Sequence, residues 1–222
     1  MPVGIPKVPF LIPEDEEATW VDIYNRLHRE RALFLCQKLD FEITNTLVGL
    51  VVFLSRDDKT RNQFLFIHCI GGWAICGMGL FDMMRYVPPH VYTLAIGSAY
   101  SIGSLVVSGG EVCERIAYPN ARVMIHQPAS SYIGPEVGVL YMEGDEFKSI
   151  YKNVLNIYKQ TTGQSLHVLQ LDMIRDFFMT PAEAQIHGIV DCVGVQTFEV
   201  DYFKDRRSRT DLDPNDVWEL IP

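Results

Sequence analysis

The feature of the sequence that most constrains its fold is an alternation of short, nearly continuous apolar runs with longer segments of helical periodicity. Strands that are apolar along their whole length are typical of a parallel sheet buried on both faces. The helical segments between them supply the crossovers that parallel strands need. The sequence therefore predicts an α/β fold of βαβ units. The predicted strands are Leu33–Cys36, Phe64–Ile67, Val91–Ile96, Val123–Ile125 and Ile189–Val193.

Two of the expected helices carry clear start signals. Asp40 is placed to cap a helix that runs to about residue 54. The segment Thr-Pro-Ala-Glu at 180–183 combines a capping Thr, a Pro in the first turn and a Glu that can close a capping box, and Gly188 can end that helix. A weaker start signal, Thr19 followed by Asp22, predicts a helix over residues 20–29. Further helices are predicted over the ranges 73–86, 101–107, 139–160 and 165–175.

The two ends of the chain differ in composition from its middle. Residues 1–18 contain four prolines and an acidic run, which predicts an irregular N-terminal arm. Residues 19–195 carry the alternating pattern and are expected to form one folded domain. Residues 196–222 are charged and show little periodicity, so we interpret them as a C-terminal extension.

Composition narrows the class of protein. The 222 residues are 48% hydrophobic and 21% charged, which suits a single domain with a large core. The formal net charge of −9 makes nucleic acid an unexpected partner. Five cysteines without a C-x-x-C pair argue against a disulfide framework or zinc site and favour a reducing compartment. We also expect no membrane span and no leader peptide, so that the protein works where it is made.

Two polar residues follow predicted strands and are candidates for chemistry. Ser101 stands at the turn between the strand Val91–Ile96 and the next helix, where a helix N-terminus favours developing negative charge. His126 directly follows the strand Val123–Ile125, and functional groups of parallel sheets gather at that edge. Each residue alone is more often a helix cap or a surface histidine. Three other serines compete with Ser101 on composition, namely Ser98, Ser104 and Ser108.

The Gly71-Gly72 pair and Asp176 complete a possible catalytic set. Paired glycines let backbone N–H groups approach a ligand closely, although an isolated pair is usually a plain turn. A carboxylate could orient the imidazole of His126, but spacing alone does not separate Asp176 from Asp172. Acyl transfer requires a nucleophile, a base, an orienting carboxylate and oxyanion donors, and all four types occur here. The sequence does not establish that they meet in space.

At these residues the sequence resembles the Clp protease proteolytic subunit family of serine peptidases, and most of all the form encoded in plastid genomes. The resemblance covers roughly residues 1–195. Its most specific parts are MPVGIPKVPF at 1–10, WVDIYNRL at 20–27, RVMIHQPASS at 122–131, and the segments RD, FM, AEA and HGIVD at 175–176, 178–179, 182–184 and 187–191.

The resemblance implies both a fold and an activity. The fold is a crotonase-like spiral of βαβ units, with a protruding helical handle at about residues 133–160 and an axial arm at 1–18. The activity is that of a serine-type Clp endopeptidase. Ser101 would be the nucleophile, His126 the base and Asp176 the orienting acid. Gly72 and Ile102 would supply the oxyanion N–H groups, and no metal or other cofactor is implied.

The resemblance also implies partners and a location. Two stacked seven-membered rings of Clp proteolytic subunits would enclose a chamber, into which an AAA+ ATPase chaperone feeds unfolded proteins. Neither nucleic acid nor a membrane is an implied partner. The chloroplast stroma is the implied location, with the bacterial cytoplasm as the alternative.

The sequence departs from the family pattern around the glycine pair. Residues 68–72 are His-Cys-Ile-Gly-Gly, where the family usually has Asn-Ser-Pro-Gly-Gly, and the missing Pro predicts a freer oxyanion loop. A structural ring subunit with weak or no catalysis is therefore the main alternative. A crotonase-type acyl-CoA enzyme is another, although no general-base carboxylate motif for it is visible. A metal site or cysteine nucleophile at His68, Cys69 and Cys76 lacks further placed ligands.

Overall fold

A seven-stranded sheet forms the centre of the computed structural model, which describes residues 4–10, 19–129 and 137–194. Its strands pair in the order β3-β4-β5-β6-β9, while β7 pairs with the far end of β5 and also with β8. All these pairings are parallel except β7 with β8. The strands are β3 (Ala32–Leu35), β4 (Gln63–Cys69), β5 (Val91–Tyr100), β6 (Arg115–Ala117), β7 (Arg122–Ile125), β8 (Phe177–Met179) and β9 (Cys192–Val193).

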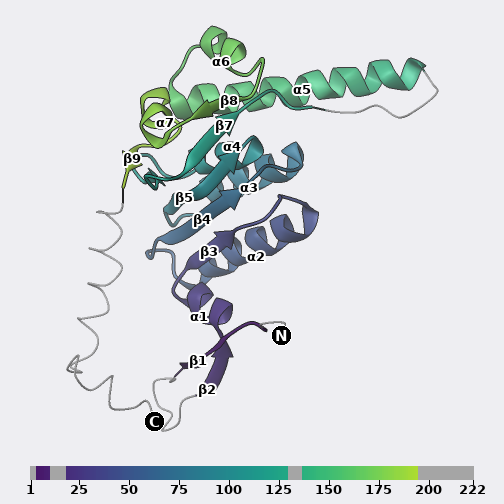
Figure 1. Ribbon diagram of the computed structural model, residues 1–222. Coiled ribbons are helices and arrows are strands. Elements are labelled where there is room, and N and C mark those ends of the chain that lie inside the picture. Colours follow the sequence, from purple (N-terminus) through teal and green to yellow (C-terminus); the bar gives the residue numbers. More distant parts are fainter. Residues whose placement is uncertain (1–3, 11–18, 130–136, 195–222) are drawn as a thin grey trace.

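Helices cover the sheet and follow the same order as its strands (Figure 1). Helix α2 packs on α3, α3 on α4, and α4 on α5, so each of these helices contacts the next one along the chain. One end of α5 extends well beyond the body of the fold, while its other end packs near α6 and α7 (Figure 1). The helices are α1 (Ile23–Arg29), α2 (Phe41–Asp57), α3 (Ala74–Tyr86), α4 (Ile102–Ser108), α5 (Val137–Thr162), α6 (Leu166–Asp172) and α7 (Pro181–His187).

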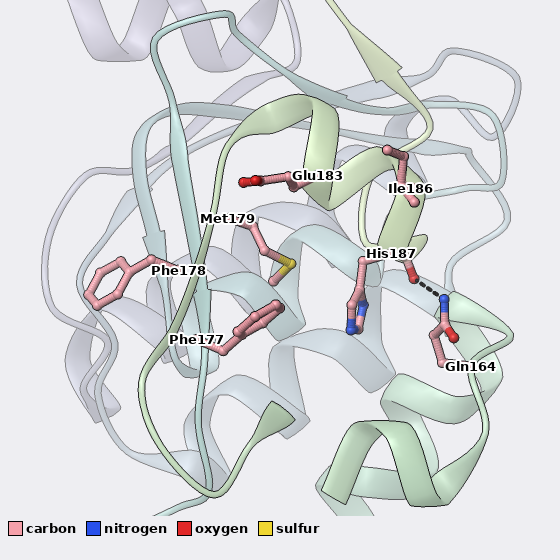
Figure 2. A pocket seen from close by; sticks show the side chains of 7 residues that line it. All are labelled: Gln164, Phe177, Phe178, Met179, Glu183, Ile186 and His187. Carbon is pink, nitrogen blue, oxygen red and sulfur yellow. Dashed lines mark hydrogen bonds between the residues drawn. The ribbon is translucent and has the colours of Figure 1, made fainter. Parts of the chain in front are cut away.

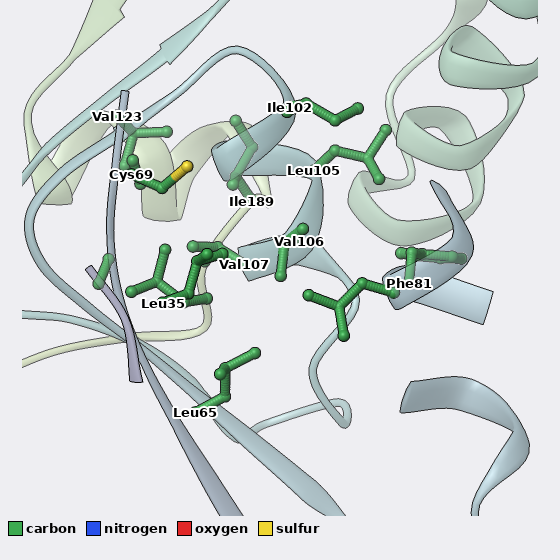
Figure 3. Packing of buried hydrophobic residues seen from close by; sticks show 14 of the residues in the cluster. Leu35, Leu65, Cys69, Phe81, Ile102, Leu105, Val106, Val107, Val123 and Ile189 are labelled. Carbon is green, nitrogen blue, oxygen red and sulfur yellow. The ribbon is translucent and has the colours of Figure 1, made fainter. Parts of the chain in front are cut away.

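The core lies between the sheet and these helices. Leu35 and Leu65 of neighbouring strands are fully buried and belong to one cluster with Leu105 of α4 and Phe81 of α3 (Figure 3). Burying a side chain of this size stabilises the fold by about 1.5–3 kcal/mol relative to leaving it exposed. The cluster also includes Ile102, so the residue that follows Ser101 is held by core packing.

The predicted α/β class with parallel βαβ units is confirmed, as are the strongest helix signals. Asp40 accepts a hydrogen bond from the backbone N–H of Ile43 at 3.0 Å, and α2 ends three residues beyond the predicted 54. Thr180 forms the predicted capping box with Glu183. Gly188 ends α7 in the left-handed conformation, with φ of 92°.

Two predictions at the N-terminal end were wrong. Residues 20–22 are not helical but belong to strand β2 (Thr19–Asp22), and α1 begins only at Ile23. The predicted irregular arm contains strand β1 (Lys7–Phe10), which pairs antiparallel with β2. Cross-strand pairing of Val8 with Val21 outweighs the weak helix signal at Thr19, because β-branched residues fit a pleated pair.

Strand prediction was also incomplete beyond residue 90. β6 and β8, each three residues long, were not predicted, and β5 continues four residues past the expected Ile96. The expected closing strand Ile189–Val193 is reduced to Cys192–Val193, because Ile189 completes the end of α7 through a hydrogen bond to Ala184 O at 2.9 Å.

Parts of three predicted segments lie outside the described residues. They are most of the arm at 1–18, residues 133–136 of the handle, and the extension at 196–222. The part of the predicted handle that is described lies in α5, from Val137 onward. Within the described residues, every helix is either too short or too polar to traverse a lipid bilayer.

Candidate active site

Ser101 lies at the junction of β5 and α4 in an unusual backbone conformation. Its φ is 56° and its ψ is −124°, values that cost a non-glycine residue about 1–3 kcal/mol. The surrounding structure holds it there, since its backbone N–H donates to Met124 O at 2.8 Å. The hydroxyl thereby stands at the edge of the sheet where α4 begins.

The pairing of β5 with β7 brings His126 to the same edge. Tyr100 is in register with Met124, so Ser101, one residue further on, and His126, two residues further on, emerge close together. The distance between Ser101 Oγ and His126 Nε2 is 2.8 Å. The chain after His126 is anchored by a hydrogen bond from Gln127 N to Met173 O at 2.8 Å.

Asp176 reaches His126 because β8 runs antiparallel to β7. Phe177 is in register with Ile125, and the preceding Asp176 therefore faces His126, with 2.8 Å between Asp176 Oδ1 and His126 Nδ1. Asp172, which spacing could not exclude, instead accepts from His187 Nε2 at 3.0 Å. The two carboxylates are therefore distinguished by the histidine that each one binds.

Hydrogen counting assigns the protons in this chain of bonds. An ionised carboxylate only accepts hydrogen bonds, so His126 Nδ1 carries the proton that Asp176 binds. The lone pair of neutral His126 is then on Nε2 and accepts the hydroxyl proton of Ser101. This arrangement is the one in which an imidazole can withdraw a proton from a serine. The serine competitors point elsewhere: Ser98 bonds to His68, Ser104 to Ser101 O, and Ser108 to Leu105 O.

The Gly71-Gly72 loop lies directly against the serine. A Cβ added to Gly71 would lie 3.1 Å from Ser101 Cβ, and one added to Gly72 would lie only 2.0 Å from Leu39 O. Leu39 fixes the loop from the other side: its N–H donates to Gly71 O at 2.9 Å, and its carbonyl accepts from Trp73 N at 3.0 Å.

Two backbone N–H groups next to Ser101 have no acceptor within the part of the chain that the structure describes. They belong to Gly72 and to Ile102, the first residue of α4. The partial positive charge of a helix N-terminus adds to the Ile102 donor. A negatively charged oxygen is the kind of group that such a pair of donors can stabilise.

His68 and Cys69, which differ from the usual residues of the family pattern, restrain the Gly71-Gly72 loop. Cys69 is fully buried, and its Sγ lies 3.4 Å from Gly71 N and 3.5 Å from Gly71 O. Burial raises the pKa of the Cys69 thiol, which favours the neutral form that can both accept and donate. His68 Nδ1 accepts from Ser98 N at 3.0 Å, tying the loop to β5. These contacts restrain a loop that lacks the usual Pro.

No group of three or more His, Cys, Asp or Glu side chains suited to a metal ion occurs among the described residues. His68 and Cys69 instead make the contacts given above. Cys76 is a buried residue of α3.

A shallow hollow of about 300 Å³ lies beside β8 and α7. Figure 2 shows its lining, which is formed mostly by β8 and α7. Gln164 closes one wall through a hydrogen bond from its Nε2 to His187 O at 3.2 Å. Because Ser101, His126 and Asp176 are absent from its lining, we do not assign the hollow to the candidate site.

Comparison with known proteins gives a consistent result. The profile of the family described as Clp protease matches residues 14–197. A protein of Acorus calamus named "ATP-dependent Clp protease proteolytic subunit" is 55% identical over 194 residues, which are 87% of this chain and 96% of that protein. Proteins with the same name from Drimys granadensis and Buxus microphylla are 52% and 51% identical over 196 residues, covering 88% of this chain and 97% of each.

Proposed function

The chain belongs to the Clp protease family, and from this premise we propose that it is the proteolytic subunit of an ATP-dependent Clp protease that hydrolyses peptide bonds by a serine mechanism. The observation that carries the proposal is the unbroken chain of two 2.8 Å hydrogen bonds from Ser101 through His126 to Asp176. Ser101 is the nucleophile, His126 the general base and Asp176 the orienting carboxylate.

The first half of the reaction forms an acyl-enzyme. Ser101 Oγ attacks the scissile carbonyl carbon while its proton passes to His126 Nε2, and the carbonyl π-electrons move onto oxygen. The Gly72 and Ile102 N–H groups bind that oxyanion, each such donor lowering the barrier by about 3–4 kcal/mol. The tetrahedral intermediate collapses when the C–N bond breaks and His126 gives its proton to the leaving amine.

The second half regenerates the serine. A water molecule gives a proton to His126 Nε2 as its oxygen attacks the acyl carbon, and the same two N–H groups bind the second oxyanion. The bond to Ser101 Oγ then breaks and the hydroxyl recovers its proton from His126. Asp176 remains ionised throughout and stabilises the imidazolium at each step.

The alternative of a non-catalytic ring subunit depends on a weakened oxyanion loop. Two features argue against it: Cys69 and Leu39 hold the Gly71 peptide, and the Gly72 N–H is left without a competing acceptor in the described chain. The crotonase alternative requires a carboxylate base in the pocket, whereas Asp176 is paired with His126.

We further propose the assembly and its location. The chain joins other Clp proteolytic subunits in two stacked seven-membered rings, and an AAA+ ATPase feeds unfolded proteins into the chamber. The protruding α5 serves as the handle, residues 1–18 as an axial arm and residues 196–222 as an extension. The plant relatives support a location in the plastid, and within it we propose the stroma.

Replacing Ser101 by Ala in the assembled complex tests the proposal. We expect the variant to assemble normally, and a fluorophosphonate probe, mapped by mass spectrometry, to label Ser101 of the wild-type chain but nothing in Ser101→Ala. The matched control is Ser108→Ala, which removes a buried hydroxyl of α4 that donates to Leu105 O. Absence of an adduct on this chain, while other subunits of the same complex are labelled, favours the non-catalytic subunit.

A further inference from the structure

The peptide group between Ser101 and Ile102 connects two parts of the active site. Its N–H is the Ile102 donor, and its C=O belongs to the serine. A trans peptide is planar, with N–H and C=O pointing in opposite directions. Whatever binds Ser101 O therefore fixes the direction of the Ile102 N–H.

Ser101 O is held by two buried hydroxyl side chains that the mechanism above does not use. Ser104 of α4 has no exposed surface, and its Oγ lies 2.6 Å from Ser101 O. Tyr158 of α5 is 2% exposed, and its hydroxyl lies 2.8 Å from Ser104 Oγ and 3.3 Å from Ser101 O. The backbone N–H of Ser104 adds a third donor at 3.1 Å.

Each hydroxyl has one proton, which limits how the bonds can be arranged. The shortest contact assigns the proton of Ser104 to Ser101 O, in preference to Met124 O at 3.0 Å. Tyr158 then donates to Ser104 Oγ or to Ser101 O. Burial raises the pKa of Tyr158, so its hydroxyl keeps its proton at neutral pH. Linked hydrogen bonds of this kind polarise one another in a low-dielectric interior.

We propose that Ser104 and Tyr158 are positioning residues for peptide hydrolysis: they hold the Ser101–Ile102 peptide plane so that its N–H faces the oxyanion. This inference rests on the proposed serine mechanism and extends it. The strained φ of Ser101 explains the need for such support, because the peptide would otherwise relax toward an ordinary conformation. Withdrawal of electron density through Ser101 O also makes the Ile102 N–H a stronger donor.

The test uses rings in which this chain is the only active subunit, any other subunits having their nucleophiles replaced by Ala. Hydrolysis of a fluorogenic peptide is compared for Ser104→Ala, Tyr158→Phe and the control Ser108→Ala. Losing one oxyanion donor lowers kcat by about 10²–10³-fold, so misorienting one should cost about tenfold for Ser104→Ala and about threefold or more for Tyr158→Phe. KM is expected to change less than twofold in both.

A peptide boronate, which forms a tetrahedral adduct with the serine, supplies the second readout. Its inhibition constant should rise by the same factor by which kcat falls. A purely structural role would leave the inhibition constant of the boronate unchanged. Ser104→Thr keeps the hydroxyl and should recover most of the activity. Tyr158→Phe removes one oxygen and keeps the ring, so it remains informative if Ser104→Ala fails to assemble.

Two results would overturn the inference. One is a kcat for both variants no lower than that of Ser108→Ala, and the other is a loss carried by KM with the boronate affinity unchanged. Either result leaves the proposed function intact as long as the wild-type chain is labelled on Ser101. Absence of that labelling would instead refute the proposed function itself.

Discussion

Replacing Asp176 by Asn tests how much of the proton transfer depends on a carboxylate at this position. Asn keeps the shape of Asp, but its amide can turn an NH₂ group toward His126 Nδ1. That group donates, so it stabilises the tautomer with the proton on Nε2, which cannot accept the proton of Ser101. The charge that stabilises the imidazolium is lost as well.

The magnitude follows from the exposure of the pair. The same change in a buried serine-protease triad lowers kcat by about 10⁴-fold. Here the Asp176 side chain is 61% exposed and that of His126 is 29% exposed, so water shares in solvating the imidazolium. Two unit charges about 4 Å apart interact by about 1 kcal/mol in water and about 4 kcal/mol at an effective dielectric of about 20. We therefore expect a loss of about 10²–10³-fold, or about 2.7–4 kcal/mol.

The assay is the rate at which a fluorophosphonate labels Ser101, because the adduct is assigned to this chain even within a mixed ring. Asp172→Asn is the matched control: it removes a carboxylate four positions away that binds His187 instead of His126. We expect the control to label within about threefold of the wild-type rate, since Asp172 lies outside the hydrogen-bonded set. Equal labelling rates for Asp176→Asn and wild type, or equal losses in the two variants, would refute the reasoning.

Two further substitutions test the loop and the sheet. Gly72→Ala places a methyl group 2.0 Å from Leu39 O, so the loop must shift, and peptidase activity should fall by about 10²-fold or more; wild-type kcat in this variant would contradict the proposed oxyanion hole. Asp191→Ala leaves the 7%-exposed Arg115 guanidinium without its carboxylate and should lower the free energy of unfolding by about 3–5 kcal/mol. Chemical denaturation of the assembled complex measures that loss, and an unchanged midpoint would contradict it.

The parts of the fold predicted well are those whose causes are local in sequence. The caps at Asp40 and Thr180 satisfy N–H groups three residues away, so their signals lie within one helical turn. The parallel strands β3, β4, β5 and β7 were found because each contains a run of consecutive apolar residues. β6 and β8 have three residues each, which is too short for a pattern, and their pairing partners determine them.

In the candidate site, too, the residues with a local sequence signal were predicted and those that depend on distant partners were not. Ser101 and His126 could be singled out because each follows a recognisable strand. Asp176 could not be separated from Asp172, because the choice depends on the antiparallel register of β8 against β7. Ser104 was visible only as one of several serines, and its link to Tyr158 joins positions 54 residues apart that no local pattern relates.

Helix α5 connects these distant parts through a single rigid element. Its 26 residues make a rod about 39 Å long, whose outer portion stands clear of the body while Tyr158, near the inner end, reaches the serine peptide. A rod transmits a tilt or rotation along its whole length. A contact on the outer portion that tilts α5 would therefore move Tyr158 and, through it, the peptide group that follows Ser101.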